Sequence, residues 1–299
     1  MRIRDFFRLI TSAGSGWIDD NAMRLSAALA YYSLFSLAPL LIIVISVASL
    51  VLGDAAARGQ VSAQISQLAG ARAADAIQSL VLTTSRKGVT ATVISLVLLF
   101  FGASSAFIEL KDALNSIWGV ALKPGRPLLM LVRGRFISFT MVLAVGFLLL
   151  VSLAINAGLT AFGASIRGLL ALPGTFWQCT DFGISFVVVT ILFAMIFKLL
   201  PNVNIRWRDV WIGAGGTAFL FTVGKFLIGF YLGTSGVTSY YGAAGSVIVI
   251  LLWIYFSACI LFLGAEFTKA FVLKYGLGIV PDHLAEFRPG SLASTLRGG

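Results

Sequence analysis

The sequence carries little charge for its length. Only 11% of its 299 residues are Asp, Glu, Lys or Arg, whereas about a quarter is usual in a soluble globular protein. Hydrophobic residues make up 59% of the chain, and the mean hydropathy is +0.96. This composition argues against a soluble domain and predicts a membrane protein, because a helix of about 20 apolar residues spans the hydrocarbon core of a bilayer.

Groups that perform catalysis or bind metals are also scarce. His283 is the one histidine and lies in the C-terminal tail, which argues against a Ser-His-Asp triad or a histidine metal site within the membrane. The two cysteines, Cys179 and Cys259, lie in or beside apolar runs and give no sign of a disulfide framework. The chain has no Walker A loop, which excludes an ATP-driven pump, and no HExxH or CxxC motif. We therefore expect no enzymatic activity, no metal and no cofactor.

Six apolar runs are long enough to cross a bilayer as helices. The first contains Pro39 and exceeds the length of a straight crossing, so we expect this helix to tilt or kink. The sequence thus predicts an all-α bundle of about six transmembrane helices, folded as one membrane domain over 1–299. The expected spans cover about 25–52, 88–108, 136–162, 182–200, 210–232 and 244–268.

Short amphipathic helices are expected outside these spans. Residues 2–10 combine apolar residues at helical spacing with three arginines, a pattern suited to an anionic membrane surface. The first external segment, about 53–87, predicts a helix that either lies on the outer surface or caps the bundle, and a third pattern follows the second span. The apolar positions of the three patterns are Ile3, Phe6, Phe7 and Ile10; Val61, Ile65, Leu68, Ile77 and Leu80; and Phe107, Leu110, Leu114 and Ile117.

The net charge of +10 is explained by membrane orientation. With six spans, 16 of the 22 Lys and Arg residues fall on the side of the two termini and five fall on the opposite side. Cytoplasmic loops of membrane proteins are enriched in Lys and Arg. We therefore expect both termini in the cytoplasm, membrane lipids as partners, and no nucleic acid. A homo-oligomer is compatible with the sequence.

Lys225 is the first candidate for a functional site, because charged groups inside hydrocarbon are costly and often functional. It lies in the fifth span, nearer the outer end, where Asn156 and Tyr241 are expected at similar depth and Asp181 is the nearest acidic residue. Two interpretations remain open. Lys225 either extends its ammonium to the outer interface, or faces a cavity that opens to the outer half of the membrane.

Glu266 is the second candidate and lies at a different depth, near the cytoplasmic end of the sixth span. Arg24, at the base of the first span, and Glu109, at the base of the second, are expected at the same level. The three could form an inner polar cluster. This cluster would be either a salt-bridge network that fixes the helix ends, or an inner gate or lipid-headgroup site.

Small residues form the third set. The fifth span is rich in glycine, and the pair Gly229 and Gly233 has the spacing that lets two membrane helices approach closely. The alternative is that glycine and proline interrupt helices around a site at the membrane midplane, as in transporters.

Several stretches resemble the YihY/BrkB family of bacterial inner-membrane proteins. The clearest are Arg24–Pro39 (RLSAALAYYSLFSLAP) and Leu251–Ala258 (LLWIYFSA), the latter running on to Gly264–Phe267 (GAEF). Weaker similarities are found at Asn115–Gly119 (NSIWG), at Pro201 with Trp207 and Arg208, and at Tyr241–Ser246 (YGAAGS). The resemblance covers about 15–275.

The resemblance implies a six-span protein of the bacterial inner membrane. The family once carried the label ribonuclease BN, which is regarded as a misassignment, and this chain lacks the acidic metal cluster that such hydrolysis uses. Some relatives are linked to serum resistance and to export of lipid or lipopolysaccharide precursors. The leading hypothesis is a transporter of a lipid or amphiphilic envelope molecule that is not driven by ATP. The alternative is a structural or assembly protein of the cell envelope that transports nothing.

Overall fold

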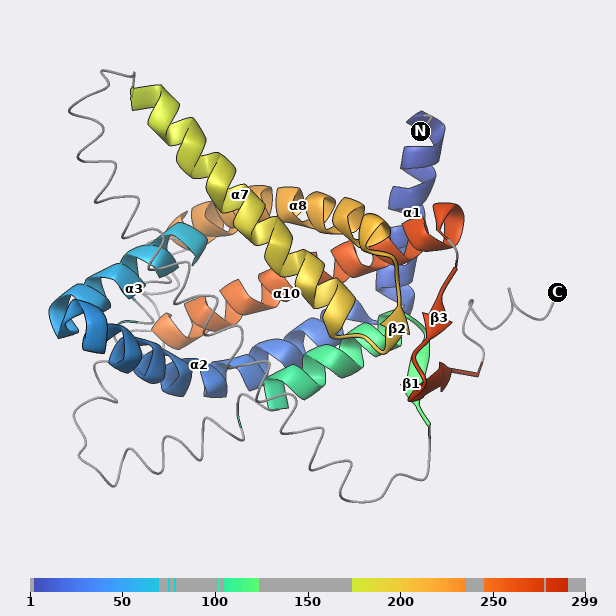
Figure 1. Ribbon diagram of the computed structural model, residues 1–299, viewed down its shortest axis with the longest axis horizontal. Helices are drawn as coiled ribbons and strands as arrows, with labels where there is room; N and C mark the ends of the chain where they lie inside the picture. The colour runs from blue at the N-terminus through green and yellow to red at the C-terminus, as the bar shows by residue number, and fades with distance from the viewer. Residues whose placement is uncertain are drawn as a thin grey trace.

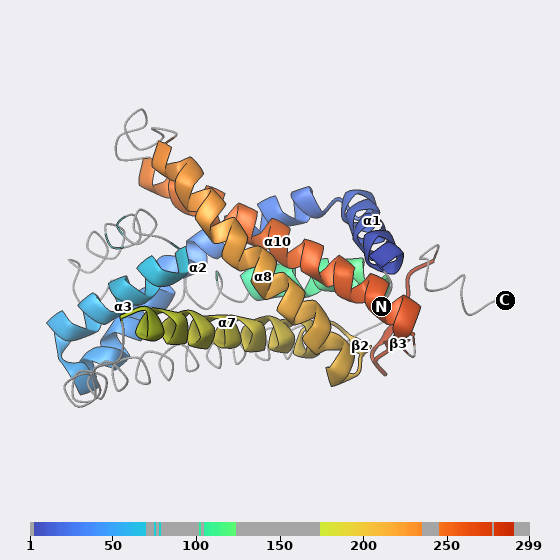
Figure 2. The same ribbon diagram turned by 90° about the horizontal axis from the view of Figure 1, so that it is seen from above.

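The computed structural model describes residues 3–69, 75, 78, 102, 105–123, 174–234, 245–276 and 278–289. Within these residues the chain is mainly helical, as predicted, with two short antiparallel ribbons in addition. The long helices α2, α7, α8 and α10 form the bundle, and α7 crosses α8 and α10 obliquely (Figure 1, Figure 2). Their bounds are Ala22–Leu52 (α2), Gly174–Leu199 (α7), Trp207–Thr234 (α8) and Gly245–Tyr275 (α10).

These four helices coincide with four of the six expected spans. Helix α2 continues without interruption through Pro39, and α7 ends just before Leu200 and Pro201, where proline could not extend it. Within the described residues, Trp207–Tyr231 and Val247–Tyr275 are long and apolar enough to cross a membrane. The expected span over 88–108 is described only at its end, and the span over 136–162 lies outside the described residues.

Helix α1 (Ile3–Asp19) is longer than the helix expected over 2–10. It crosses the end of the bundle where the two ribbons lie, and it packs against α10 (Figure 1). Leu9 and Ala13 are buried, whereas Phe7, Ile10 and Ile18 are exposed. One side of α1 is therefore held by the bundle, and a second apolar stripe stays exposed.

Helix α3 (Asp54–Ala69) occupies the first external segment, as expected. It follows α2 after a turn at Gly53, whose φ of 80° suits glycine, and Val61 is buried. Apolar and polar residues are mixed around α3 rather than separated on two faces, so the prediction of an amphipathic helix is wrong in this respect. Its many alanines weaken any such separation.

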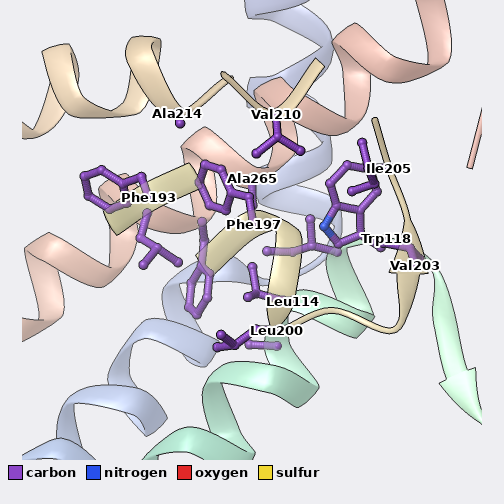
Figure 3. Close-up of a cluster of buried hydrophobic side chains, with 14 of the residues drawn as sticks. Leu114, Trp118, Phe193, Phe197, Leu200, Val203, Ile205, Val210, Ala214 and Ala265 are labelled. Atoms are coloured by element: carbon purple, nitrogen blue, oxygen red, sulfur yellow. The ribbon is translucent and has the colours of Figure 1, made fainter. Parts of the chain in front are cut away.

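The main core (Figure 3) includes Val203 of strand β2 (Val203–Asn204) and lies at the end of the bundle where α1 and β2 are found (Figure 1). Trp118 and Phe197 are fully buried there, and the core side chains come from the helix over 105–117, from α7, α8 and α10, and from the loop between α7 and α8. Leu114 and Ile117, predicted on one helical face, are both fully buried. The close packing of these elements fixes the base from which α8 and α10 extend.

Two ribbons tie the C-terminal segment to this base. Strand β1 (Val120–Leu122) pairs with β4 (Ala285–Phe287), and β2 (Val203–Asn204) pairs with β3 (Val280–Pro281), both antiparallel. Two side chains add to the attachment. The Arg288 guanidinium donates to the Ser116 hydroxyl at 2.7 Å, and the Lys123 ammonium donates to the His283 carbonyl at 3.1 Å.

A buried hydrogen bond links two of the motifs that the sequence carries. The Asn202 backbone N–H donates to the Asn115 side-chain oxygen at 2.8 Å, and both residues are buried. We expect Asn115→Ala to destabilise the fold by about 1–3 kcal/mol, because a buried N–H would lose its acceptor. Thermal unfolding of purified protein in detergent measures this loss. Ser116→Ala is the control, because its partner Arg288 is exposed. Equal stability of the two variants would contradict the prediction.

Candidate functional site

Glu266 is the most deeply buried charged residue that the structure describes, with 2% of its surface exposed. It lies on α10 beneath α1, opposite Gly16. A methyl group added at Gly16 would lie 2.5 Å from one Glu266 carboxylate oxygen, so the glycine allows the α1 backbone to cover this side chain. Burial of an acidic side chain in an apolar helix is costly unless the charge is paired.

Lys269 supplies that pairing. Its ammonium lies 3.2 Å from a Glu266 oxygen and 3.2 Å from an Asp20 oxygen. Lys269 follows Glu266 by one helical turn, whereas Asp20 comes from the turn between α1 and α2. We call Asp20, Glu266 and Lys269 the inner ion cluster. In it two carboxyl groups share one ammonium across the contact between α1 and α10.

Two further contacts hold α1 on α10. The Trp17 indole N–H donates to the Cys259 carbonyl at 3.2 Å, and the Lys274 ammonium lies 2.8 Å from an Asp5 oxygen. These contacts fall on either side of the inner ion cluster along α10. Helix α1 therefore contacts α10 on both sides of the cluster.

Arg24 and Glu109 do not complete the cluster that the sequence predicts. Arg24 is exposed on α2, and the ion pairs within the described ranges join Glu266 to Lys269 rather than to Arg24. Glu109 is half-buried on the helix over 105–117, where burial and the nearby Asp112 carboxylate raise the pKa of its carboxyl. The expected partner was wrong because Lys269, on the same helix as Glu266, already occupies the position beside it.

Lys225 is half-buried on α8, and its ammonium lies 5.5 Å from the centre of the Phe226 ring. Its neighbour Gly224 faces Ile260 of α10, and Thr217 faces Gly264. These contacts place Lys225 level with Phe256 to Cys259 of α10. Seven to ten residues then separate that level from Glu266, or about 10–15 Å at helical rise. Lys225 and the inner ion cluster therefore lie at different levels along α8 and α10.

Helices α8 and α10 meet through a reciprocal pair of small residues. Gly213 of α8 faces Thr268 of α10, and Gly264 of α10 faces Thr217 of α8. Each threonine hydroxyl donates to the carbonyl of the glycine four residues earlier on its own helix, at 2.7 Å in both cases. Gly229 makes no such contact with the described residues, because a methyl group added there would meet nothing within 4 Å.

An apolar groove lies between α8 and α10, beyond this crossing. Its volume is about 330 Å³. The lining is almost entirely apolar and includes Gly224, next to Lys225, but not Lys225 itself. The groove is lined by Gly224, Leu227, Ile228 and Tyr231 of α8 and by Phe256, Cys259 and Ile260 of α10.

The remaining candidates from the sequence are not placed. Asn156 and Tyr241 lie outside the described residues. Asp181 lies within α7, but its side chain lies outside the description.

Asp20 and Lys269 were not anticipated as members of the site. The spacing of Glu266 and Lys269, three residues apart on one helix, is a signal that the sequence offers for their ion pair. Asp20 offers none, because its role depends on how α1 folds back over α10.

Comparison with known proteins places the chain among membrane proteins. A family model described as "Virulence factor BrkB" matches residues 13–282. A UPF0761 membrane protein of Pseudomonas aeruginosa PAO1 is 28% identical over 251 residues, which is 83% of this chain and 59% of the relative. A UPF0761 membrane protein of Stenotrophomonas maltophilia K279a is 28% identical over 277 residues, covering 90% of this chain and 62% of the relative.

The chain thus spans about three fifths of the length of these relatives. No solved structure gives a significant match.

Proposed function

This chain belongs to the BrkB family of membrane proteins, and from that premise we propose that it transports a lipid or amphiphilic envelope molecule across the bacterial inner membrane. The observation that carries the proposal is the inner ion cluster. A carboxylate that is only 2% exposed lies in a helix apolar enough to cross a membrane. Ionisable groups in such helices commonly mark the path of a substrate or a coupling ion.

The proposed topology has six spans with both termini in the cytoplasm. Helices α2, α7, α8 and α10 supply four of these spans, and the expected helices over 88–108 and 136–162 supply the other two. Exposed basic residues gather at the end of the bundle where α1 and the ribbons lie, among them Arg4, Arg8, Arg206, Arg208 and Arg288. This charge supports a cytoplasmic location for that end.

Lys225 is the cationic position that suits an anionic substrate, and it lies about 10–15 Å from Glu266 along the helix axes, towards the outer end. The ammonium of Lys269 is already shared by Glu266 and Asp20 in the inner ion cluster. A negatively charged headgroup that leaves the cytoplasmic side would pass this paired cluster and then meet Lys225. The proposal includes no catalytic step and no ATP hydrolysis.

The proposal is tested by lipid translocation in proteoliposomes, with labelled anionic and zwitterionic lipids. We expect Glu266→Gln and Lys225→Met each to lower the initial rate by about tenfold, as loss of one charge-assisted interaction would. Phe219→Leu is the control, because Phe219 is exposed on α8 and belongs to neither site. All variants are compared at equal folding, measured by circular dichroism and size exclusion. Variant rates equal to that of the wild type would remove these residues from the path.

A structural or assembly role is the second candidate, and the paired state of the inner ion cluster favours it. Each charge of the cluster already has a protein partner, as expected of a group that fixes helix packing. On this account Glu266→Gln lowers the unfolding temperature and changes nothing else. Wild-type protein that is folded and moves no lipid would favour this role.

A further inference from the structure

The groove between α8 and α10 differs from the rest of their contact. At Gly213 and Gly264 the two helices leave no room even for a methyl group. Towards the outer end of α8 the same pair of helices borders an open groove of about 330 Å³. That volume is at the lower limit of ligand sites in proteins, which hold about 300–1,000 Å³.

The surroundings of the groove indicate what kind of molecule reaches it. Leu227 and Tyr231 line the groove and are also more than half exposed, so its wall continues into the outer surface of α8. Phe226 and Phe230 extend this exposed apolar surface. In a helix that crosses the membrane, such a surface contacts lipid hydrocarbon. A lipid chain can therefore enter from the side, without passing through water.

The shape and chemistry of the groove favour a single chain. A second α-helix, about 10–12 Å wide with its side chains, is too thick for this space. The lining offers almost no polar surface to pair the backbone of an extended peptide, which in hydrocarbon must have its hydrogen bonds satisfied. An acyl chain needs no such partners.

Apolar contacts alone would not make the groove selective for one kind of lipid, because all lipid tails are as apolar as the groove itself. The charge of Lys225 can provide this selectivity. It follows Gly224, which forms part of the groove wall, and its side chain is only partly exposed. A cation at this depth is strongly attractive to a phosphate, because the surrounding dielectric constant is low.

We propose that this groove holds one acyl chain of an anionic phospholipid, with the lipid phosphate drawn to Lys225. This inference rests on the proposed transport function and names its substrate class: a lipid that carries a negative headgroup and at least one long chain. The groove would be one position on the path, about 10–15 Å from the inner ion cluster along α10.

The test uses full-length protein in proteoliposomes that contain phosphatidylglycerol with a photoreactive diazirine on its chain. Phosphatidylcholine with the same chain is the matched neutral probe. Mass spectrometry of the crosslinked peptides should place the label on 224–231 and 256–260, in excess over the rest of α8 and α10. We expect phosphatidylglycerol to label these segments about fivefold more than phosphatidylcholine, a preference that one ion pair can provide.

Two variants locate the site. Cys259→Phe fills the groove and should lower the labelling of both segments about fivefold. Lys225→Met should remove the preference for phosphatidylglycerol and leave labelling by phosphatidylcholine unchanged. Phe219→Trp adds the same kind of bulk on an exposed part of α8 outside the groove and should change neither result. Gel filtration and circular dichroism confirm that each variant is folded.

Three outcomes would overturn the proposal. The first is labelling spread evenly along α8 and α10 that is insensitive to Cys259→Phe. The second is equal labelling by the two lipids in the wild type. The third is an unlabelled groove in a protein whose copies can be crosslinked to each other through Cys259. This crosslinking uses a bismaleimide and the Cys179→Ser variant, in which Cys259 is the remaining cysteine. Such a result would show that a second copy of the chain covers the groove. Groove labelling without translocation would keep the lipid site and overturn the transport function instead.

Discussion

Gly264→Leu is expected to push α8 away from α10 and to destabilise the fold. The added side chain would overlap the Thr217 side chain, because even a methyl group at Gly264 would already clash with it. Overpacking of a single core position costs about 1–3 kcal/mol. Gly213→Leu should have a similar effect, and the double variant should not fold. Expression level and monodispersity in detergent measure the outcome.

The controls for this prediction lie on the same helix. Gly215 and Gly229 of α8 have open space where a side chain would point. Gly215→Leu and Gly229→Leu should therefore fold and express like the wild type, although Gly229 has the spacing that sequence analysis associates with close packing. Failure of Gly229→Leu together with normal folding of Gly264→Leu would show that the helices meet through another face.

Lys269→Met is expected to be the most destabilising change within the inner ion cluster. Removing the ammonium leaves the buried Glu266 and the nearby Asp20 without their shared counter-charge. Breaking a buried ion pair in this way costs about 3–5 kcal/mol. The measurement is the midpoint of thermal unfolding in detergent. Lys274→Met is the control, because its pair with Asp5 lies at the surface and exposed pairs contribute little.

A double variant separates lost charge from lost packing. Combining Lys269→Met with Glu266→Gln removes the uncompensated buried charge, so we expect it to recover much of the stability that Lys269→Met loses. Stability losses that simply add would show that the two residues do not interact, and would contradict the inner ion cluster.

Hydropathy predicts the positions of the four long described helices because it reports a property of each helix by itself. The ends of α2 and α7 fall within a few residues of expectation, except where α7 begins earlier, at Gly174. Helix α10 runs seven residues past the expected end at Thr268, because Phe271 and Val272 continue its packed face. Helix α1 was underestimated because its later residues are polar in composition, and Ala13 and Trp17 become part of the packing only where α10 lies against them.

The site was less predictable because it depends on which helices touch. Glu266 could be identified from its charge in an apolar run, and Lys269 from its spacing. The partner Asp20 could not, since only the turn at Asn21, with a φ of 52°, brings it beside α10. Which glycines lie in the contact between α8 and α10 likewise depends on how the two helices are rotated about their axes. The sequence has several similar glycine spacings and does not show that Gly213 and Gly264, rather than Gly229, make this contact.

Lipid translocation by the purified protein tests the central claim most directly. The account predicts that wild-type protein in liposomes moves an anionic phospholipid faster than protein-free liposomes do, and that Glu266→Gln at equal folding is slower by about tenfold. The claim would be contradicted if folded wild-type protein moved neither anionic nor zwitterionic lipid and Glu266→Gln changed only the stability. The inner ion cluster would then be a structural contact between α1 and α10.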